Sequence, residues 1–273
     1  MKLLNTNFSQ RLAVATVGIP IVGLILVGGL LPLFLFIYLL AIISLFEISK
    51  MLSNVNLRLF PNLFIPLALL IVYFVSQAEP YIRNLVVFSA IIVSILAIVV
   101  MYSNQLHLNK FFKNVCITLI ATLVISVPLS FAILIYQLPL GLQLLATVVF
   151  GIFSFDTGAY VFGTILGKNK MAPRISPGKT WEGAFFGTII CLVTVGILDM
   201  IFGLNLNKFT LILVAFNIAC FGQIGDLVES YFKRRTKSKD SSKLLPGHGG
   251  FLDRIDSMII VLPTIYYGLL LWA

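Results

Sequence analysis

The chain has 273 residues, of which 59% are hydrophobic and only 11% charged, and its formal net charge is +9. An ordinary soluble domain is about 45 to 50% apolar and about 25% charged, so the composition excludes a soluble globular protein and indicates a chain embedded in lipid. No long polar stretch interrupts the apolar runs. We therefore expect residues 1–273 to form a single polytopic membrane domain.

Apolar runs recur from one end of the chain to the other, each near the roughly 20 residues that a helix needs to cross a bilayer. They predict an all-α integral membrane protein with about nine transmembrane helices and short connections. The predicted spans are residues 12–28, 31–49, 60–77, 84–102, 115–136, 142–166, 182–203, 209–229 and 256–273.

The basic residues orient these spans, because cytoplasmic loops carry an excess of Lys and Arg. Of the 19 Lys and Arg residues, all but Arg83 and Lys208 fall on the side of the N-terminus. This separation predicts a cytoplasmic N-terminus and, after nine spans, a C-terminus outside. The charge of +9 is then mostly a topology signal, and we infer no nucleic-acid partner from it.

The acidic residues are placed unevenly, with only Glu47 and Glu79 in the first half of the chain. A carboxylate inside a span costs about 2.5 to 3.5 kcal/mol on insertion scales, so such residues are usually kept for a function or a paired charge. We therefore expect the catalytic region within residues 150–260.

Two acids precede the main cluster, and each has two interpretations. Asp156 lies deep in a predicted span, where it serves either a site or a structural hydrogen bond to a neighbouring helix. Glu182 follows Lys179 and Thr180, and Thr180 is a candidate helix N-cap after a turn at Ser176 and Pro177. A plain acid in the first helical turn is the alternative for Glu182.

The segment from Asp226 to Asp256 is the strongest feature of the sequence. On a helix, Asp226 and Glu229 share one face, as do Asp253 and Asp256. If these faces converge, their oxygen atoms suit Mg²⁺, which is normally held by one or two carboxylates and substrate phosphates.

Several basic residues lie between these acids in the sequence, and together they could neutralise a triphosphate and a leaving pyrophosphate. For any single lysine, the positive-inside rule is a sufficient explanation. That rule does not explain the pair Gly249 and Gly250, which precedes a helix N-terminus that could receive phosphate. Nor does it explain His248 beside this pair, although a lone histidine there is more often a local hydrogen-bonding group.

From Ser230 onward the sequence SYFKRRTKSKDSSKLLPGHGGFLDRID resembles the C-terminal signature of the phosphatidate cytidylyltransferases, also called CDP-diglyceride synthetases. The segments DTGAY from Asp156 and SPGKTWEG from Ser176 are also similar to that family. The matching signature positions are Ser230, Lys233, Arg234, Lys239, Asp240, Pro246, His248, Gly249, Gly250, Asp253, Arg254 and Asp256.

The resemblance implies a homodimer that transfers the cytidylyl group of CTP to phosphatidic acid and releases pyrophosphate. It implies Mg²⁺ as cofactor, alongside a monovalent cation such as K⁺, with Asp226 and Asp253 as metal ligands. From the sequence itself, Asp156 and Glu182 are further candidates for metal ligands. The expected catalytic residues are Asp256, Lys239 and His248. The expected substrate-binding residues are Lys179, Lys233, Arg234, Gly249, Gly250 and Arg254.

The expected location is the cytoplasmic (inner) membrane of a bacterium, with the active site facing the cytoplasm and lipid as a further partner. Two alternatives stay open. One is another CTP-dependent lipid enzyme, such as a polyprenol kinase or an ether-lipid cytidylyltransferase. The other is a cation-coupled secondary transporter that uses Asp156 and Asp226 as a relay, although the sequence has no internal repeat.

Overall fold

The computed structural model describes residues 16, 18, 20–89, 92, 110–242, 244 and 249–272. Six helices in this part are long and apolar enough to cross a membrane. They are α2 (Leu30–Ser53), α5 (Lys110–Tyr136), α6 (Gly141–Ile165), α7 (Trp181–Phe202), α8 (Lys208–Arg235) and α9 (Leu252–Trp272). A shorter apolar helix, α3, covers Pro61–Gln77, and residues 20–27 and 80–89 are also helical. The chain is therefore a multi-pass, α-helical membrane protein.

Each predicted span meets one of these helices, although the spans 12–28 and 84–102 fall partly outside the described residues. Two boundaries differ in a way that matters for the site. Helix α8 continues to Arg235, six residues beyond the predicted end, because basic side chains in a last turn are favourable at the negative end of the helix dipole. Helix α9 begins at Leu252, so Asp253 already lies in its first turn.

The connection between α6 and α7 is a β-hairpin that the sequence analysis does not predict. Strand β1 (Lys170–Ala172) pairs antiparallel with β2 (Ser176–Thr180). The turn lies at residues 173–175, so the predicted turn at Ser176 and Pro177 is wrong and these residues begin a strand. A proline is tolerated there because it is the second residue of an edge strand.

The chain folds into two compact units, the first formed by Met1–Ile133 with Thr236–Arg254. In this unit α2 packs against α3 through the edge-to-face rings of Phe46 and Phe64, whose centroids are 5.1 Å apart. The start of α3 is held by α5, since the Phe60 N–H donates to Thr118 Oγ1 at 3.1 Å.

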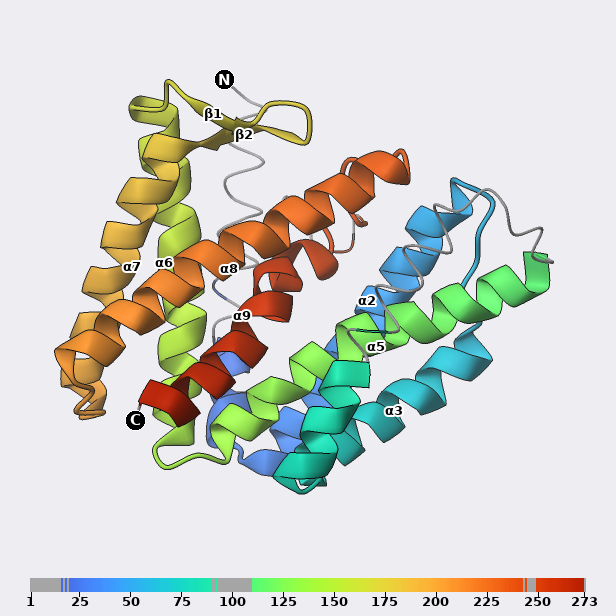
Figure 1. The fold of residues 1–273 in the computed structure, drawn as a ribbon, viewed down its shortest axis with the longest axis horizontal. Coiled ribbons are helices and arrows are strands. Elements are labelled where there is room, and N and C mark those ends of the chain that lie inside the picture. The colour runs from blue at the N-terminus through green and yellow to red at the C-terminus, as the bar shows by residue number, and fades with distance from the viewer. Residues whose placement is uncertain are drawn as a thin grey trace. The chain divides into compact units, whose positions relative to one another are not determined.

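The second unit comprises Leu134–Arg235 and Ile255–Ala273, and here α6 and α7 lie side by side (Figure 1). The sequence GAFFG from Gly183 to Gly187 lets the two backbones approach closely. A Cβ added at Gly183 would lie 2.5 Å from the carbonyl oxygen of Ala159 on α6, and one at Gly187 would lie 2.9 Å from that of Phe155. Small residues therefore set this helix pair.

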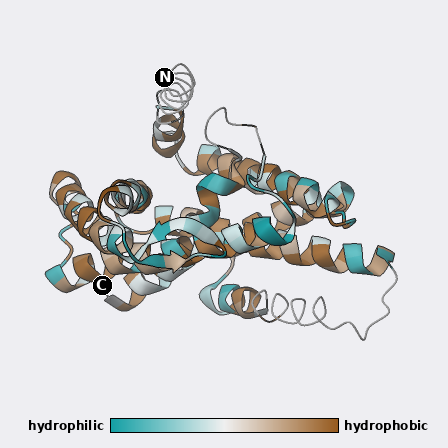
Figure 2. Ribbon diagram, turned by 90° about the horizontal axis from the view of Figure 1, so that it is seen from above, coloured by the Kyte–Doolittle hydropathy of each residue, from teal (hydrophilic) through white to brown (hydrophobic). Residues whose placement is uncertain are grey.

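Hydrophobic residues run along the helices (Figure 2). On α7, Phe185, Ile189, Val193 and Ile197 follow one another at intervals of four residues and are all exposed. Such a stripe lies on one face of a helix, and in a bilayer it contacts lipid.

Candidate active site

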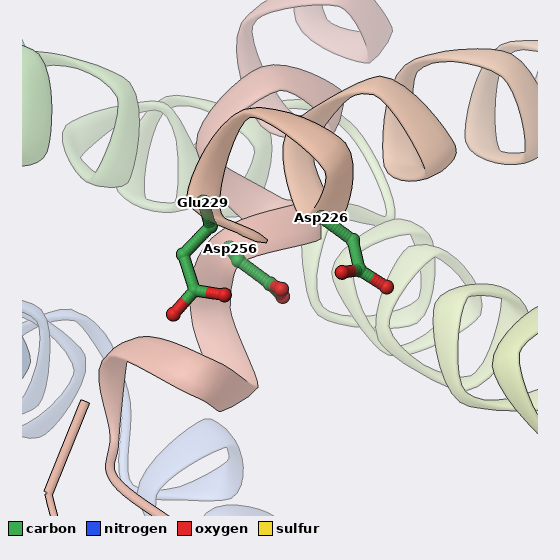
Figure 3. A group of neighbouring side chains, drawn as sticks. All are labelled: Asp226, Glu229 and Asp256. Atoms are coloured by element: carbon green, nitrogen blue, oxygen red, sulfur yellow. The ribbon is translucent and has the colours of Figure 1, made fainter. Parts of the chain in front are cut away.

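Three carboxylates converge where α8 and α9 cross in the second unit. One oxygen atom each from Asp226, Glu229 and Asp256 lies within 4.8 Å of the others, and Figure 3 shows the Asp256 carboxylate between those of Glu229 and Asp226. Glu229 and Asp256 are buried, whereas Asp226 is partly exposed. Such a set of oxygen donors fits a hard divalent cation.

The crossing of the two helices depends on a glycine beside the first of these acids. A Cβ added at Gly225 would lie 2.4 Å from the carbonyl oxygen of Asp256, so only glycine allows α9 to approach α8 at this point. Further along the helices, the Thr264 hydroxyl donates to Asn217 Oδ1 at 2.8 Å. Close backbone contact therefore places Asp256 beside the α8 carboxylates.

Two lysines balance part of the negative charge. Lys179 Nζ lies 2.6 Å from Asp226 Oδ2, and Lys233 forms an ion pair with Glu229 one helical turn before it. Both are among the predicted substrate-binding residues. Three carboxylates and two ammonium groups thus meet in the part of the chain that the structure describes, and the carboxylate oxygens are donors that a divalent cation prefers.

Strand β2 of the hairpin carries Lys179, which contacts the cluster. The next polar residues, Thr180 and Glu182, join the hairpin to α7. Thr180 caps α7, because its Oγ1 accepts the Gly183 N–H at 3.1 Å, as predicted. Glu182 accepts the Lys168 N–H, the Asn169 N–H and the Asn169 side-chain amide at 2.7 to 3.2 Å. These contacts give Glu182 a structural role in holding the base of the hairpin, rather than a place in the carboxylate cluster.

Asp253, the second predicted metal ligand, caps the start of its own helix in the first unit. Its Oδ2 accepts the Gly250 N–H at 2.8 Å, the Ser241 hydroxyl at 3.0 Å and the Ser241 N–H at 3.1 Å. The carboxylate that α9 contributes to the group of three is Asp256, and Asp253 is not a member of this group. The sequence analysis placed Asp256 among the catalytic residues, as a supporting or additional metal ligand, and gave Glu229 no role, although it placed Glu229 on the same helical face as Asp226.

The glycine turn before α9 does not offer its amides to a phosphate in this structure. The Gly250 N–H is taken by Asp253, and those of Phe251 and Leu252 by Glu47. Gly249 adopts a φ of +82°, a backbone conformation that favours glycine. The pair is therefore needed for the turn, and the predicted phosphate contact at Gly250 is replaced by carboxylates of the chain itself.

Sequence reasoning missed Glu47 because it placed all function in the last four spans. This glutamate is 2% exposed on α2 and lies in the first unit with the turn that it contacts. The available signal was a lone carboxylate within the predicted span 31–49, which requires an internal partner by the same argument that singled out Asp156.

The remaining predicted residues lie as follows. Asp156 is exposed on α6 and is not a member of the group of three. Arg234 donates from Nε to the carbonyl oxygen of Ile175 at 3.3 Å, which ties the end of α8 to the hairpin. Lys239 and Arg254 are exposed. His248 lies outside the described residues.

A model of the cytidylyltransferase family matches residues 9–272 of this chain. Among curated proteins, a phosphatidate cytidylyltransferase of Staphylococcus haemolyticus is 39% identical over 244 residues, which cover 89% of this chain and 91% of that protein. A phosphatidate cytidylyltransferase of Staphylococcus epidermidis is 38% identical over the same shares. One of Staphylococcus aureus is 36% identical over 88% of this chain and 91% of that protein.

Proposed function

The chain belongs to the cytidylyltransferase family, and on this premise we propose that it transfers the cytidylyl group of CTP to phosphatidic acid, giving CDP-diacylglycerol and pyrophosphate. It is a nucleotidyltransferase of phospholipid synthesis. The observation that carries this conclusion is the extent of the similarity, since relatives named for the activity match 88 to 89% of the chain. The family match over residues 9–272 spans the carboxylate cluster, and it argues against the interpretation as a transporter.

The carboxylate cluster is the proposed site of the reaction, with Mg²⁺ held by Asp226, Glu229 and Asp256. The donor set supports this proposal, because all three candidate ligands offer hard oxygen atoms that lie within 4.8 Å of one another. A bound Mg²⁺ would supply neutralisation of the charge on the phosphates of CTP. A monovalent cation such as K⁺ beside it stays a prediction from the family resemblance.

The chemistry requires little from the protein besides positioning and charge. A phosphate oxygen of phosphatidate is already ionised near neutral pH, so it can form the new bond to the α-phosphorus of CTP without a general base. The bond from the α-phosphorus to the bridging oxygen of the β-phosphate breaks, and that oxygen leaves with pyrophosphate. Groups that hold and neutralise phosphates are therefore the ones the reaction needs.

Lys179 and Lys233 are proposed to supply part of that neutralisation. In the structure each pairs with a carboxylate of the cluster. If Asp226 and Glu229 bound Mg²⁺ in place of the lysines, the two ammonium groups would become available to phosphate oxygens within the same site. Arg234 adds positive charge in the last turn of α8, and Lys239 and Arg254 stay phosphate contacts predicted from the sequence alone.

The active site is proposed to face the cytoplasm, from the inner membrane of a bacterium. Basic residues support this placement, because Lys179, Lys233 and Arg234 all belong to the positively charged side of the predicted topology. The same rule supports a cytoplasmic N-terminus and an external C-terminus. The homodimer that the family resemblance implies is a further proposal.

A direct assay tests the function. Purified protein given labelled CTP, Mg²⁺ and phosphatidate should form a lipid-soluble cytidine product and one pyrophosphate for each molecule of that product. Replacing phosphatidate by a polyprenol or by an ether-lipid phosphate tests the two rival lipid enzymes. Turnover with either alternative and none with phosphatidate would overturn the assignment.

A further inference from the structure

Glu47 is a buried carboxylate that the reaction chemistry above does not use. It lies on α2 with 2% of its surface exposed, and both of its oxygens are fully engaged. Oε1 accepts the Ser242 hydroxyl at 2.6 Å and the Phe251 N–H at 3.0 Å. Oε2 accepts the Ser241 hydroxyl at 2.9 Å and the Leu252 N–H at 2.8 Å.

The position of this carboxylate is that of an anion bound at a helix N-terminus. The N–H groups in the first turn of a helix have no partner within the helix, and the helix dipole adds positive potential there. Glu47 satisfies two of these donors at the start of α9 and two hydroxyls from the segment before it.

The glycine turn before α9 packs tightly against Glu47. A Cβ added at Gly250 would lie 2.5 Å from Oε1 and 2.6 Å from Oε2, so the turn passes directly over the carboxylate. The Ser241 hydroxyl also lies 3.0 Å from Asp253 Oδ2. A hydroxyl carries one proton, so Ser241 shares it between Glu47 and Asp253, and its backbone N–H gives Asp253 a separate hydrogen bond.

We propose that Glu47 is a positioning residue for cytidylyl transfer, because it fixes where α9 begins and thereby places Asp256. Leu252, whose N–H it binds, precedes Asp256 by four residues in the same continuous helix, which is about one turn. The inference rests on the proposed function, since Asp256 is the member of the carboxylate cluster that α9 contributes. It assigns to an N-terminal helix a part in a site built from C-terminal residues.

Glu47→Gln is the sharpest substitution, because it keeps the size of the side chain while replacing one acceptor oxygen by an NH₂ group. A serine hydroxyl facing that group can rotate, but a backbone N–H cannot, so one amide of Phe251 or Leu252 loses its acceptor. We expect kcat to fall by about ten-fold or more, since misplacement of a reacting group by about 1 Å can cost 100-fold. We also expect a rise in the Mg²⁺ concentration that gives half-maximal activity.

Glu79→Gln is the matched control, because Glu79 is the other acid in the first half of the chain and is exposed. Kinetics are measured in purified protein and expressed per folded molecule, with amide hydrogen exchange followed over residues 249–256. Glu47→Gln should show faster exchange in this segment, the lower kcat and the higher Mg²⁺ requirement, and Glu79→Gln should match the wild type in all three.

A purely structural role predicts a different result. Glu47→Gln would then unfold at a lower temperature while its folded fraction kept the wild-type kcat and Mg²⁺ dependence, and that result would overturn the inference while leaving the proposed function intact. If Glu47→Gln does not fold, Ser242→Ala removes only one of the four donors and should shift the Mg²⁺ requirement in the same direction. An unshifted requirement in that variant would also overturn the inference. A wild type that forms no CDP-diacylglycerol would refute the proposed function, and the inference with it.

Discussion

At the scale of the residue, the candidate site combines three carboxylates with two lysines that already form ion pairs with two of them. Asp226 pairs with Lys179 from the hairpin, and Glu229 pairs with Lys233 from its own helix. Asp256 is buried beside both acids. We therefore expect substitutions of the carboxylates to weaken Mg²⁺ binding, and substitutions of the lysines to weaken CTP binding.

The carboxylates are tested by Asp226→Asn and Asp256→Asn, made singly. Each should lower kcat by about 100-fold or more, because a bound cation supplies several kcal/mol of charge stabilisation and each 1.36 kcal/mol is a factor of ten. Steady-state formation of CDP-diacylglycerol measures the effect. Asp199→Asn is the control, since Asp199 binds the Leu206 N–H after α7 and its loss should change kcat by less than about two-fold. Near-wild-type turnover in either site variant would remove that residue from the metal site.

Lys179 gives a prediction in which two effects have opposite signs. Lys179→Ala removes a cation from beside Asp226, so Mg²⁺ should reach half-maximal activity at a lower concentration. The same change removes a phosphate contact and should lower kcat/KM for CTP by about ten-fold, the equivalent of 1.4 kcal/mol. Lys170→Ala on the neighbouring strand is the matched control, because Lys170 is exposed. If Lys179→Ala raised the Mg²⁺ requirement as well as lowering kcat/KM for CTP, the ion pair of Lys179 with Asp226 would not compete with Mg²⁺ binding.

At the scale of the element, the hairpin and α7 act as one piece because their junction is bonded on both sides. Thr180 ends β2 and caps α7, and Glu182 in the first turn binds Lys168 and Asn169 before β1. Lys179 is the residue immediately before the cap. The placement of its ammonium group therefore depends on where α7 starts.

The cap provides the corresponding prediction. Thr180→Ala should destabilise the protein by about 1 kcal/mol, since the Gly183 N–H loses its acceptor in a buried position. In a chain of this length that corresponds to a fall in melting temperature of about 2 to 4 °C. Thermal unfolding in detergent measures it, and Thr180→Ser should retain most of the stability. Equal melting temperatures for the Ala and Ser variants would contradict the capping role.

At the scale of the whole molecule, the topology follows from helix lengths and basic residues. Helix α7 has 22 residues and is therefore about 33 Å long, enough to cross about 30 Å of hydrocarbon. Lys168 precedes it and Lys208 follows it, so the two lysines should lie on opposite sides of the membrane.

Thiol labelling tests this arrangement after Cys116, Cys191 and Cys220 are replaced. Cysteines introduced at Lys168 and Lys237 should react with an impermeant reagent only when the cytoplasmic side is opened. One introduced at Lys208 should react from outside the intact cell. The reverse pattern would invert the orientation and move the proposed site to the external face.

The sequence alone determined the membrane class and the approximate spans, because these depend on hydrophobicity over short stretches of chain. The catalytic region 150–260 stays a prediction from the sequence. The sequence also predicted the Thr180 cap, which needs only neighbouring residues. The tertiary structure decided which carboxylates meet. Asp256 reaches Asp226 because Gly225 permits a close helix crossing, and Glu47 reaches Phe251 across 204 residues of sequence. Such contacts depend on how helices pack in space, and no local pattern encodes which distant donor a buried carboxylate will find.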